Sequence, residues 1–241
     1  MNLCIDQGNT NTKIAVFEQD TIVDLRINPD LQTFSRLFEL YPIEHTILSS
    51  VITHHNDLMS FLLQHGIKFF LLDHHTPLPV INQYKTPETL GKDRLAAVVG
   101  AASIQQHTDL LVIDIGTAIT YDFIDAEGIY TGGDITPGIA LRLKSLHHFT
   151  QQLPMVKFDE QVGFMGTDTA TAMQSGVLYG IVSEIDGYID RLMQNYPKLS
   201  VFLTGGDAVY FEKKLKSGIF ANKNLVVIGL NRILEYNVKN N

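Results

Sequence analysis

The chain contains the same strand–turn–strand unit twice, and this repeat limits the possible folds more than any other feature of the sequence. Each copy is an apolar strand ending in aspartate, a turn with glycine and threonine, and a β-branched strand, at 3–6, 8–10 and 12–17 and again at 110–114, 116–117 and 119–125. Asp114 lies 108 positions after Asp6 (114 minus 6) in a chain of 241 residues. A chance likeness is the alternative, but recurrence of the whole unit in the same order predicts a duplicated fold.

The rest of the chain alternates strand-sized and helix-sized segments around this repeat. Third strands at 21–26 and 129–131 extend the likeness of the two copies. We expect further strands at 46–51, 67–72, 200–204 and 225–228, and helices at 31–38, 57–65, 93–106, 139–147, 169–195 and 230–237. This alternation is typical of an α/β protein in which helices cover mixed sheets. The predicted halves are residues 1–107 and 108–241.

The composition excludes several classes of function. The chain has 18 Lys and Arg residues against 26 Asp and Glu residues, which gives a formal net charge of −8. This charge argues against a nucleic-acid-binding protein, because such a protein needs a basic face to bind phosphates. Cys4, the only cysteine, can form neither an internal disulfide nor a thiolate metal site. No apolar run approaches the roughly 20 residues of a membrane helix, and the first residues lack the pattern of an export signal. We therefore expect a cytoplasmic protein with no nucleic-acid or membrane partner.

The first turn, residues 6–13, carries the groups that bind phosphate. Glycine lets the backbone approach an anion, threonine hydroxyls donate to phosphate oxygens, and Lys13 adds a positive charge. Asp6, at the end of the strand, suits a Mg²⁺ ion that arrives with the phosphate. The alternative is an ordinary hairpin turn whose aspartate accepts amide hydrogen bonds.

Two later turns are similar in character. Residues 114–117 repeat the first turn, and 204–207 form a Gly-Gly turn that leads from a strand into a helix, where backbone can lie flat against a nucleoside. A tight strand-to-helix connection is the alternative for that turn. The sequence has neither a Walker A element nor a Gly-x-Gly-x-x-Gly motif after a strand, which disfavours P-loop and dinucleotide folds.

Asp93 stands at the predicted start of a helix, between Lys92 and Arg94. Its carboxylate can cap the first turn of that helix. Alternatively it is a base beside two cations that bind an acidic substrate or a migrating phosphoryl group. In a loose phosphoryl-transfer transition state the proton moves late, so such a carboxylate mainly orients the hydroxyl and accepts its proton as the hydroxyl becomes acidic.

Five motifs, in this order and spacing, resemble the type III pantothenate kinases of bacteria: residues 6–13, 91–94, 114–118, 132–138 and 204–207. Each motif alone is weak, but together with residues 227–230 they span nearly the whole chain. The resemblance implies the fold of the acetate and sugar kinase, heat-shock ATPase and actin superfamily, two ribonuclease H-like halves with an ATP cleft between them. It also implies ATP-dependent phosphorylation of pantothenate at its terminal hydroxyl, giving 4'-phosphopantothenate in the first step of coenzyme A biosynthesis.

The resemblance implies a role for each matching residue. The nucleotide contacts are Asp6, Gln7, Gly8, Asn9, Thr10, Asn11, Thr12, Lys13 and Thr117. Asp93 is the proton acceptor, and the pantothenate contacts are Tyr84, Gly91, Lys92, Asp93, Arg94 and Thr169. Asp114 binds a monovalent cation, potassium or ammonium, and Asp6 holds Mg²⁺ with ATP. Gln7 departs from the small or apolar residue that the family often has there.

The resemblance also implies a homodimer, in which the helix at 169–195 packs on a partner; its alternative is a helix of the intramolecular core. Two other functions stay open. One is a kinase of the same superfamily for another small hydroxy acid or sugar. The other is a nucleotide-binding actin-like regulator without kinase activity.

Overall fold

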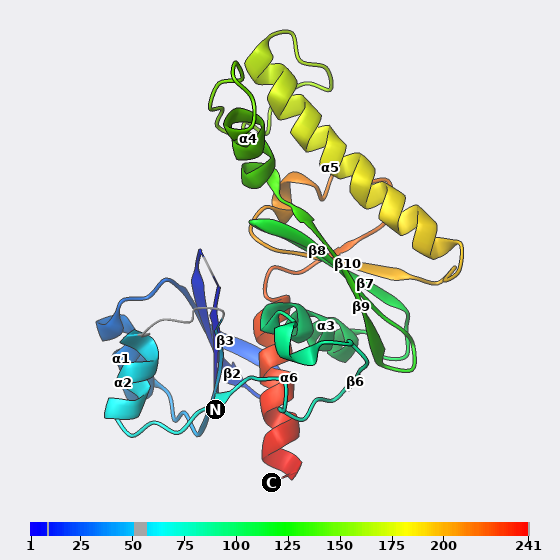
Figure 1. Ribbon diagram of the computed structural model, residues 1–241. Coiled ribbons are helices and arrows are strands. Elements are labelled where there is room, and N and C mark those ends of the chain that lie inside the picture. Colours follow the sequence, from blue (N-terminus) through cyan, green and yellow to red (C-terminus); the bar gives the residue numbers. More distant parts are fainter. Residues whose placement is uncertain (9, 51–56, 241) are drawn as a thin grey trace. The chain divides into compact units, whose positions relative to one another are not determined.

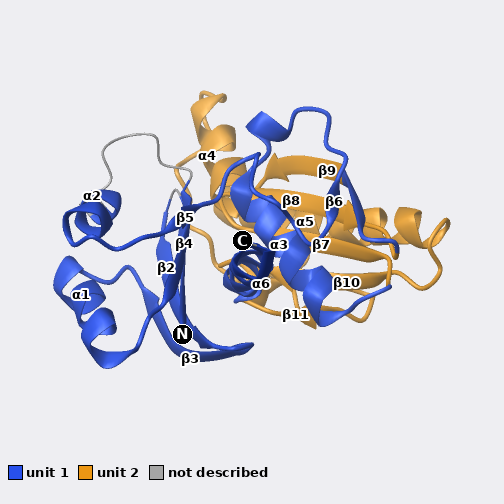
Figure 2. Cartoon of the chain, turned by 90° about the horizontal axis from the view of Figure 1, so that it is seen from below, with its two compact units in different colours: residues 1–107, 127–131, 224–241 blue, residues 108–126, 132–223 orange. Residues whose placement is uncertain are grey.

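The computed structural model describes residues 1–8, 10–50 and 57–240 (Figure 1). Asn9 of the first turn, and Val51 at the end of a predicted strand, lie outside the described residues. The chain forms two compact units (Figure 2): unit 1 is residues 1–107, 127–131 and 224–241, and unit 2 is residues 108–126 and 132–223. The first segment of unit 1 ends at the predicted boundary, but the C-terminal segment also belongs to unit 1. Among the described helices, none is long and apolar enough to cross a membrane.

Unit 1 is built on a five-stranded sheet in the order β3-β2-β1-β4-β5. Its strands are β1 (Asn2–Gln7), β2 (Thr12–Glu18), β3 (Thr21–Ile27), β4 (His45–Ser50) and β5 (Phe70–Leu71). The first three form an antiparallel meander, and β4 runs parallel to β1. Helices α1 (Leu31–Leu40) and α2 (Asp57–Gln64) bury their apolar side chains on one face of this sheet, on the same side in Figure 2. Their burial against Leu3, Ile5 and Leu48 forms the core of that layer.

Two helices that are far apart in sequence, α3 (Lys92–Ile104) and α6 (Leu225–Asn240), cross closely in unit 1. Glycines make the close approach possible. A Cβ at Gly100 would lie 2.3 Å from the Leu225 carbonyl oxygen, and one at Gly229 would lie 1.8 Å from that of Ala96. This contact explains why the C-terminal helix joins unit 1, although it follows the second copy of the repeat.

Unit 2 repeats the strand order of unit 1. Its strands are β7 (Leu110–Ile115), β8 (Ala118–Ile124), β9 (Ile129–Pro137), β10 (Ser200–Thr204) and β11 (Phe220–Ala221), although the first three residues of β9 belong to unit 1. They follow the order β9-β8-β7-β10-β11, with β7 and β8 antiparallel and β10 parallel to β7. This matches β3-β2-β1-β4-β5 strand for strand, so the predicted duplication is confirmed.

Helices α4 (Ile139–His148) and α5 (Thr169–Met193) contact each other in unit 2 (Figure 1). The buried side of α5 carries Val177, Ile181, Ile185 and Ile189 at helical spacing, and these residues pack into the core over β7, β8 and β10. One side of α5 is therefore intramolecular core. Gly176, Gly180 and Gly187 lie elsewhere on the same helix, where an added Cβ would meet nothing within 4 Å.

Several predicted elements differ from the structure. The strand expected at 225–228 is wrong, because the Ile228 amide bonds the Asn224 carbonyl oxygen at 3.0 Å and this apolar run opens α6. The short strands β6 (Ile81–Asn82) and β11 lie in segments where no strand was expected. The helix expected after Asp207 is a single 3-10 turn, η2 (Ala208–Tyr210). Another, η1 (Pro87–Thr89), lies between the strand expected at 67–72 and the helix expected at 93–106.

Candidate active site

The first Gly/Thr turn joins β1 to β2 in unit 1. Asp6 pairs with Lys13 and Gln7 with Thr12 across the antiparallel ladder. Directly opposite residues of such a pair point to the same face of the sheet, so the carboxylate of Asp6 and the ammonium group of Lys13 share one face. Within the turn, the Gly8 amide donates to the Asn11 carbonyl oxygen at 3.0 Å.

Asn28, which follows β3, holds the exit of this turn. Its Oδ1 accepts a hydrogen bond from the Thr12 amide at 2.7 Å, and its Nδ2 donates to Asn11 Oδ1 at 2.7 Å. Asn28 has a positive φ of 50°, a conformation that asparagine tolerates better than most residues. Asn28 is not among the predicted site residues, although an asparagine directly after a strand is a turn signal.

Gln7 is linked to the start of α3 through Ser50. The Ser50 hydroxyl donates to Gln7 Oε1 at 2.9 Å, and Lys92 Nζ donates to the Ser50 carbonyl oxygen at 3.4 Å. Two predicted motifs of unit 1, residues 6–13 and 91–94, are therefore brought together at the end of β4. Gln7, which differs from the residue that the family often has, is buried. Its side chain has a structural role there, because its Oε1 accepts the hydrogen bond from the Ser50 hydroxyl.

Ser49 is the Cα partner of Asp6 on the parallel strand β4. Its side chain is buried, and its hydroxyl has no hydrogen-bond partner among the described residues. A buried hydroxyl without a partner is costly in a folded protein, and a bound polar group removes that cost. The face of the sheet that carries Asp6 thus fits a ligand rich in oxygen. Nothing in the local sequence marked Ser49, because a serine in a strand has no distinctive pattern.

Asp93 lies in the first turn of α3. The helix begins at Lys92 with Gly91 as N-cap, and Asp93 Oδ1 accepts a hydrogen bond from the Arg94 amide at 2.8 Å. A Cβ at Gly91 would lie 2.6 Å from that same oxygen, so glycine leaves room for the carboxylate. Asp93 is thus not the N-cap residue, but one of its oxygens does satisfy a first-turn amide.

Arg94 and Tyr84 come together in unit 1. The guanidinium carbon of Arg94 lies 5.8 Å from the centre of the Tyr84 ring, and only 6% of Arg94 is exposed. Tyr84 stacks at 6.3 Å and 15° on Tyr130, and its amide bonds Asn82 Oδ1 at 3.0 Å. A cation held on an aromatic face is favourable, and a guanidinium group suits recognition of a carboxylate.

A small pocket of about 160 Å³ opens next to these residues in unit 1. Its lining is about half polar and half apolar. The polar groups come from Asp73, His74, Asn82, Glu88 and Lys92, and the apolar surface from Leu78, Pro87, Leu90 and Leu95.

The second Gly/Thr turn joins β7 to β8 in unit 2. The Gly116 amide donates to the Ala118 carbonyl oxygen at 3.0 Å, and Thr117 is exposed. Gly138, after β9, packs against this turn: its amide donates to the Thr117 carbonyl oxygen at 3.0 Å, and a Cβ there would lie 2.1 Å from the Gly116 carbonyl oxygen. The 132–138 motif therefore packs against the second Gly/Thr turn through backbone contacts of Gly138.

The Gly-Gly turn after β10 lies against the same loop. Gly205 has a φ of +96°, and a Cβ there would lie 2.3 Å from the Ile115 carbonyl oxygen and 2.6 Å from Asp114 Oδ1. The Asp207 amide donates to the Ile115 carbonyl oxygen at 3.0 Å. Burial raises the pKa of Asp207 above its ordinary value. Asp114 and the 204–207 turn thus form one cluster in unit 2.

Thr169 is the exposed first residue of α5. The N-cap is Asp168, whose Oδ1 accepts a hydrogen bond from the Thr171 amide at 3.0 Å within a capping box. Hydrogen bonds from Thr171 lower the pKa of Asp168. Asp168, and not Thr169, therefore caps this helix.

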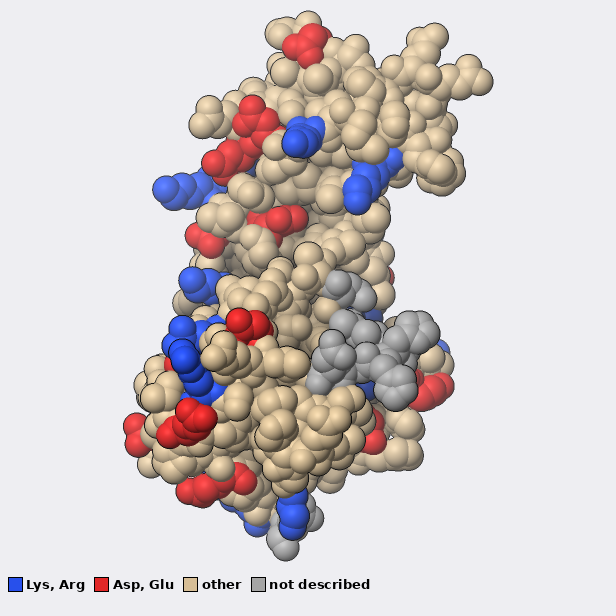
Figure 3. Space-filling view, turned by 90° about the vertical axis from the view of Figure 1, so that its left-hand side faces the viewer, with Lys and Arg blue, Asp and Glu red and all other residues tan. Residues whose placement is uncertain are grey.

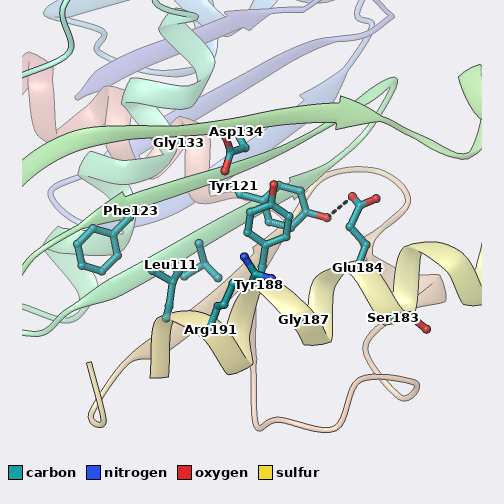
Figure 4. A pocket seen from close by; sticks show the side chains of 11 residues that line it. Leu111, Tyr121, Phe123, Gly133, Asp134, Ser183, Glu184, Gly187, Tyr188 and Arg191 are labelled. Carbon is teal, nitrogen blue, oxygen red and sulfur yellow. Dashed lines mark hydrogen bonds between the residues drawn. The ribbon is translucent and has the colours of Figure 1, made fainter. Parts of the chain in front are cut away.

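A hollow of about 590 Å³ lies against α5 in unit 2 (Figure 4). It contains none of the predicted site residues. Its lining is mainly apolar and aromatic, with Leu111, Phe123 and Leu192 beside a stack of Tyr121 on Tyr188 whose ring centres are 4.0 Å apart. Burial raises the pKa of Tyr188, and the nearby Asp134 carboxylate raises it further, so both stacked phenols stay protonated at neutral pH.

Charge is mixed on the surface of the protein. On the face drawn in Figure 3, Lys and Arg side chains are scattered among Asp and Glu rather than gathered into one basic area. With a net charge of −8, attraction of anionic ligands depends on individual cations such as Lys13, Lys92 and Arg94. Among the described residues, no group of three or more His, Cys, Asp or Glu side chains is arranged to hold a metal ion. A Mg²⁺ ion that keeps phosphate and water ligands needs only one or two carboxylates, which Asp6 fits.

The family comparison decides between the open functions. Residues 2–191 match the model of the family described as type III pantothenate kinase. The chain belongs to this family. Curated type III pantothenate kinases of Phocaeicola vulgatus and Bacteroides fragilis are each 48% identical to it; the first covers 99% of this chain and 100% of its own length, and the second 98% of both.

Solved structures agree with the fold. A Campylobacter jejuni protein named for the Baf family of transcriptional activators has a TM-score of 0.62 at 25% identity and covers 98% of this chain and 99% of its own. The ADP-bound MreB5 of Spiroplasma citri has a TM-score of 0.52 at 12% identity and covers 100% and 98%. The expected fold class, two actin-like α/β halves, is confirmed.

Proposed function

We propose that the protein transfers the γ-phosphoryl group of ATP to the terminal hydroxyl of pantothenate, giving 4'-phosphopantothenate, the first step of coenzyme A biosynthesis. Membership of the type III family supports this assignment. The observation that carries it is the arrangement at the start of α3, where Asp93, Lys92 and Arg94 lie in one helical turn and Lys92 is linked to the first Gly/Thr turn through Ser50.

Each motif of unit 1 has a part in this reaction. Arg94, held over Tyr84, binds the carboxylate of pantothenate, and Gly91 gives the substrate access to Asp93. Residues 6–13 bind phosphate oxygens through the Gly8 turn, the hydroxyls of Thr10 and Thr12, and the charge of Lys13. In unit 2, Thr117 is a further nucleotide contact, and Thr169 contacts pantothenate.

Asp93 accepts the proton of the attacking hydroxyl. The bond between the pantothenate oxygen and the γ-phosphorus forms as the bond from that phosphorus to the bridging oxygen of ADP breaks. The proton leaves the hydroxyl late, when the oxygen has become acidic, and moves to the Asp93 carboxylate. Asp93 therefore acts first by orienting the hydroxyl and then as the acceptor.

Two ions complete the proposal. When bound with ATP, Mg²⁺ neutralises charge on the phosphates, and the carboxylate of Asp6 holds it at the end of β1. Asp114 binds a monovalent cation, potassium or ammonium, because its carboxylate lies between the 114–117 turn and the 204–207 turn, with Oδ1 2.6 Å from where a Cβ at Gly205 would stand. Turnover that is the same in sodium as in potassium would remove this role from Asp114.

We also propose that the protein works in the cytoplasm as a homodimer. Its only cysteine, Cys4, is buried, and burial raises the pKa of the thiol, so it stays protonated and unreactive. The support for a dimer lies in unit 2, where Phe164 and Met165 before α5 are 69% and 77% exposed and the hollow of Figure 4 opens beside exposed glycines of α5. Exposed apolar surface of this kind is typical of an interface.

The experiment that tests the function is a substrate panel. The protein is incubated with ATP, Mg²⁺ and potassium together with pantothenate, a hexose or a small hydroxy acid, and each product is identified by mass spectrometry. Phosphopantothenate as the preferred product supports the proposal. Phosphorylation of another member of the panel alone, or ATP binding without any phosphorylated product, would contradict it.

A further inference from the structure

The carboxylate of Glu184, on α5, gathers side chains from three neighbouring elements of unit 2. Its Oε1 accepts hydrogen bonds from the Tyr121 hydroxyl of β8 at 2.8 Å and from the Thr136 hydroxyl of β9 at 2.7 Å. Its Oε2 accepts one from Arg142 Nη2 of α4 at 2.6 Å. Figure 4 shows Glu184 reaching from α5 toward Tyr121 at the wall of the hollow. One carboxylate thus ties α5 to two strands and a second helix.

This network has a single charge state at neutral pH. Burial alone would raise the pKa of Glu184, but the hydrogen bonds from Arg142, Thr136 and Tyr121 outweigh it and lower the pKa below its ordinary value. Burial and the adjacent carboxylate raise the pKa of Tyr121, so the phenol remains a donor. Hydrogen bonds to a charged acceptor are shorter and stronger than neutral ones, so the four side chains hold a defined geometry.

Through Arg142, the network extends to the second Gly/Thr turn, residues 114–117. Arg142 Nε donates to the Pro137 carbonyl oxygen at 2.7 Å, while its Nη2 is bound to Glu184. The next residue, Gly138, donates its amide to the Thr117 carbonyl oxygen at 3.0 Å, with no room for a Cβ against Gly116. The end of β9 is therefore held by Arg142 on one side and by the second Gly/Thr turn on the other.

We propose that Arg142 and Glu184 are positioning residues for nucleotide binding, which set the backbone of Thr117 through Pro137 and Gly138. This inference rests on the proposed function, in which Thr117 contacts ATP. Arginine suits the task because its planar fork makes two bonds in fixed directions, one to the carboxylate and one to the backbone. A lysine can keep the charge next to Glu184 but lacks the planar fork that makes these two bonds in fixed directions.

The test uses Arg142→Lys and Glu184→Gln, with Asp190→Asn as the matched control, since Asp190 is exposed on the same helix and outside the network. We measure kcat, the KM for ATP and for pantothenate, calorimetric binding of a non-hydrolysable ATP analogue, and amide exchange at residues 115–118. We expect both variants to weaken analogue binding and to raise the KM for ATP by about three- to tenfold, the usual size of a transmitted effect. The KM for pantothenate should stay within about twofold, and exchange at 115–118 should be faster than in the control.

A purely structural network gives a different result. If Arg142→Lys and Glu184→Gln lower the melting temperature but bind the analogue as tightly as Asp190→Asn does, the inference is wrong. Thr117→Ala separates it from the proposed function. Should Thr117→Ala weaken analogue binding while both network variants leave it unchanged, only the positioning role fails. Should the wild-type protein make no phosphopantothenate while the network variants weaken analogue binding, the proposed function fails and the positioning role stands.

Discussion

Asp6 on β1 and Lys13 on β2 lie directly opposite each other. Only the pair Gln7 and Thr12 separates them from the first Gly/Thr turn, which joins the two strands. A carboxylate and an ammonium group are thus presented together on the face of the sheet that also carries Ser49, whose hydroxyl has no partner among the described residues. In the proposed function, Lys13 balances the charge of bound phosphate and Asp6 supplies a carboxylate oxygen for its Mg²⁺ ion. This pair is the reason to propose a phosphate site here instead of an ordinary hairpin.

Replacing Asp6 by Asn should impair turnover more than pantothenate binding. The amide keeps the shape of the side chain but loses the charge that holds Mg²⁺, so we expect kcat to fall by about 10- to 100-fold. Steady-state kinetics with saturating pantothenate measure this loss, and Asp20→Asn in the exposed β2–β3 turn is the control. An equal loss of turnover and of pantothenate affinity would contradict the metal role of Asp6.

Two adjacent glycines in the 204–207 turn should respond differently to alanine. Gly205→Ala places a Cβ 2.3 Å from the Ile115 carbonyl oxygen at a φ of +96°, whereas a Cβ at Gly206 meets nothing within 4 Å. We expect Gly205→Ala to lower the free energy of unfolding by about 1–3 kcal/mol and to weaken ATP binding. Gly206→Ala should change the stability little. Equal denaturation midpoints for the two variants would show that the close packing on Asp114 is unimportant.

The raised pKa of Asp207 predicts a pH-dependent stability. The folded state disfavours the ionised carboxylate because burial removes its water, so stability falls as the pH rises through the folded-state pKa. Asp207→Asn removes this penalty and should make the nucleotide-free protein more stable than wild type near pH 7. The gain should disappear below about pH 4, where the carboxyl group is protonated in both states. Urea denaturation at several pH values checks this, and a gain that is independent of pH would point to a cause other than ionisation.

The proposed dimer can be tested by placing a charge on its exposed apolar surface. Met165→Asp should shift the protein toward monomer in sedimentation velocity, because an interface cannot bury an unpaired carboxylate. Leu63→Asp, at a 65% exposed position on α2 in unit 1, is the matched control and should leave the sedimentation coefficient unchanged. A wild-type protein that sediments as a monomer at working concentration would contradict the proposal outright.

The sequence predicted the parts of the fold that local pattern determines. Turn residues such as Gly8 and Gly116 between β-branched runs specify hairpins, and the buried spacing of Val177 and Ile181 specifies α5. The apolar run at 225–228 was misassigned because periodicity alone cannot separate a short buried strand from the start of a buried helix. The close packing of Leu225 and Gly229 on α3 explains why this segment belongs to unit 1.

The sequence could predict those residues of the candidate site that belong to a motif. It could not predict residues that only hold a motif in place through tertiary contacts. Asp93, Arg94 and Asp114 lie in recognisable sequences. Asn28 carries only the general turn signal of an asparagine after a strand, and nothing near Glu184 marks that residue. Both act through long-range contacts, Asn28 on a turn sixteen positions earlier and Glu184 on elements 42 to 63 positions away. Such contacts depend on the packed tertiary structure, so a single sequence does not reveal them.

In the proposed reaction, Asp93 accepts the proton as ATP phosphorylates pantothenate. The rate of phosphopantothenate formation by wild type and by Asp93→Asn, together with calorimetric binding of the ATP analogue to both, tests this role. We expect product with wild type, a loss of about 100- to 10,000-fold in kcat with Asp93→Asn, and unchanged nucleotide binding. Turnover within a few fold of wild type in Asp93→Asn, or nucleotide binding without any phosphopantothenate from wild type, would contradict it.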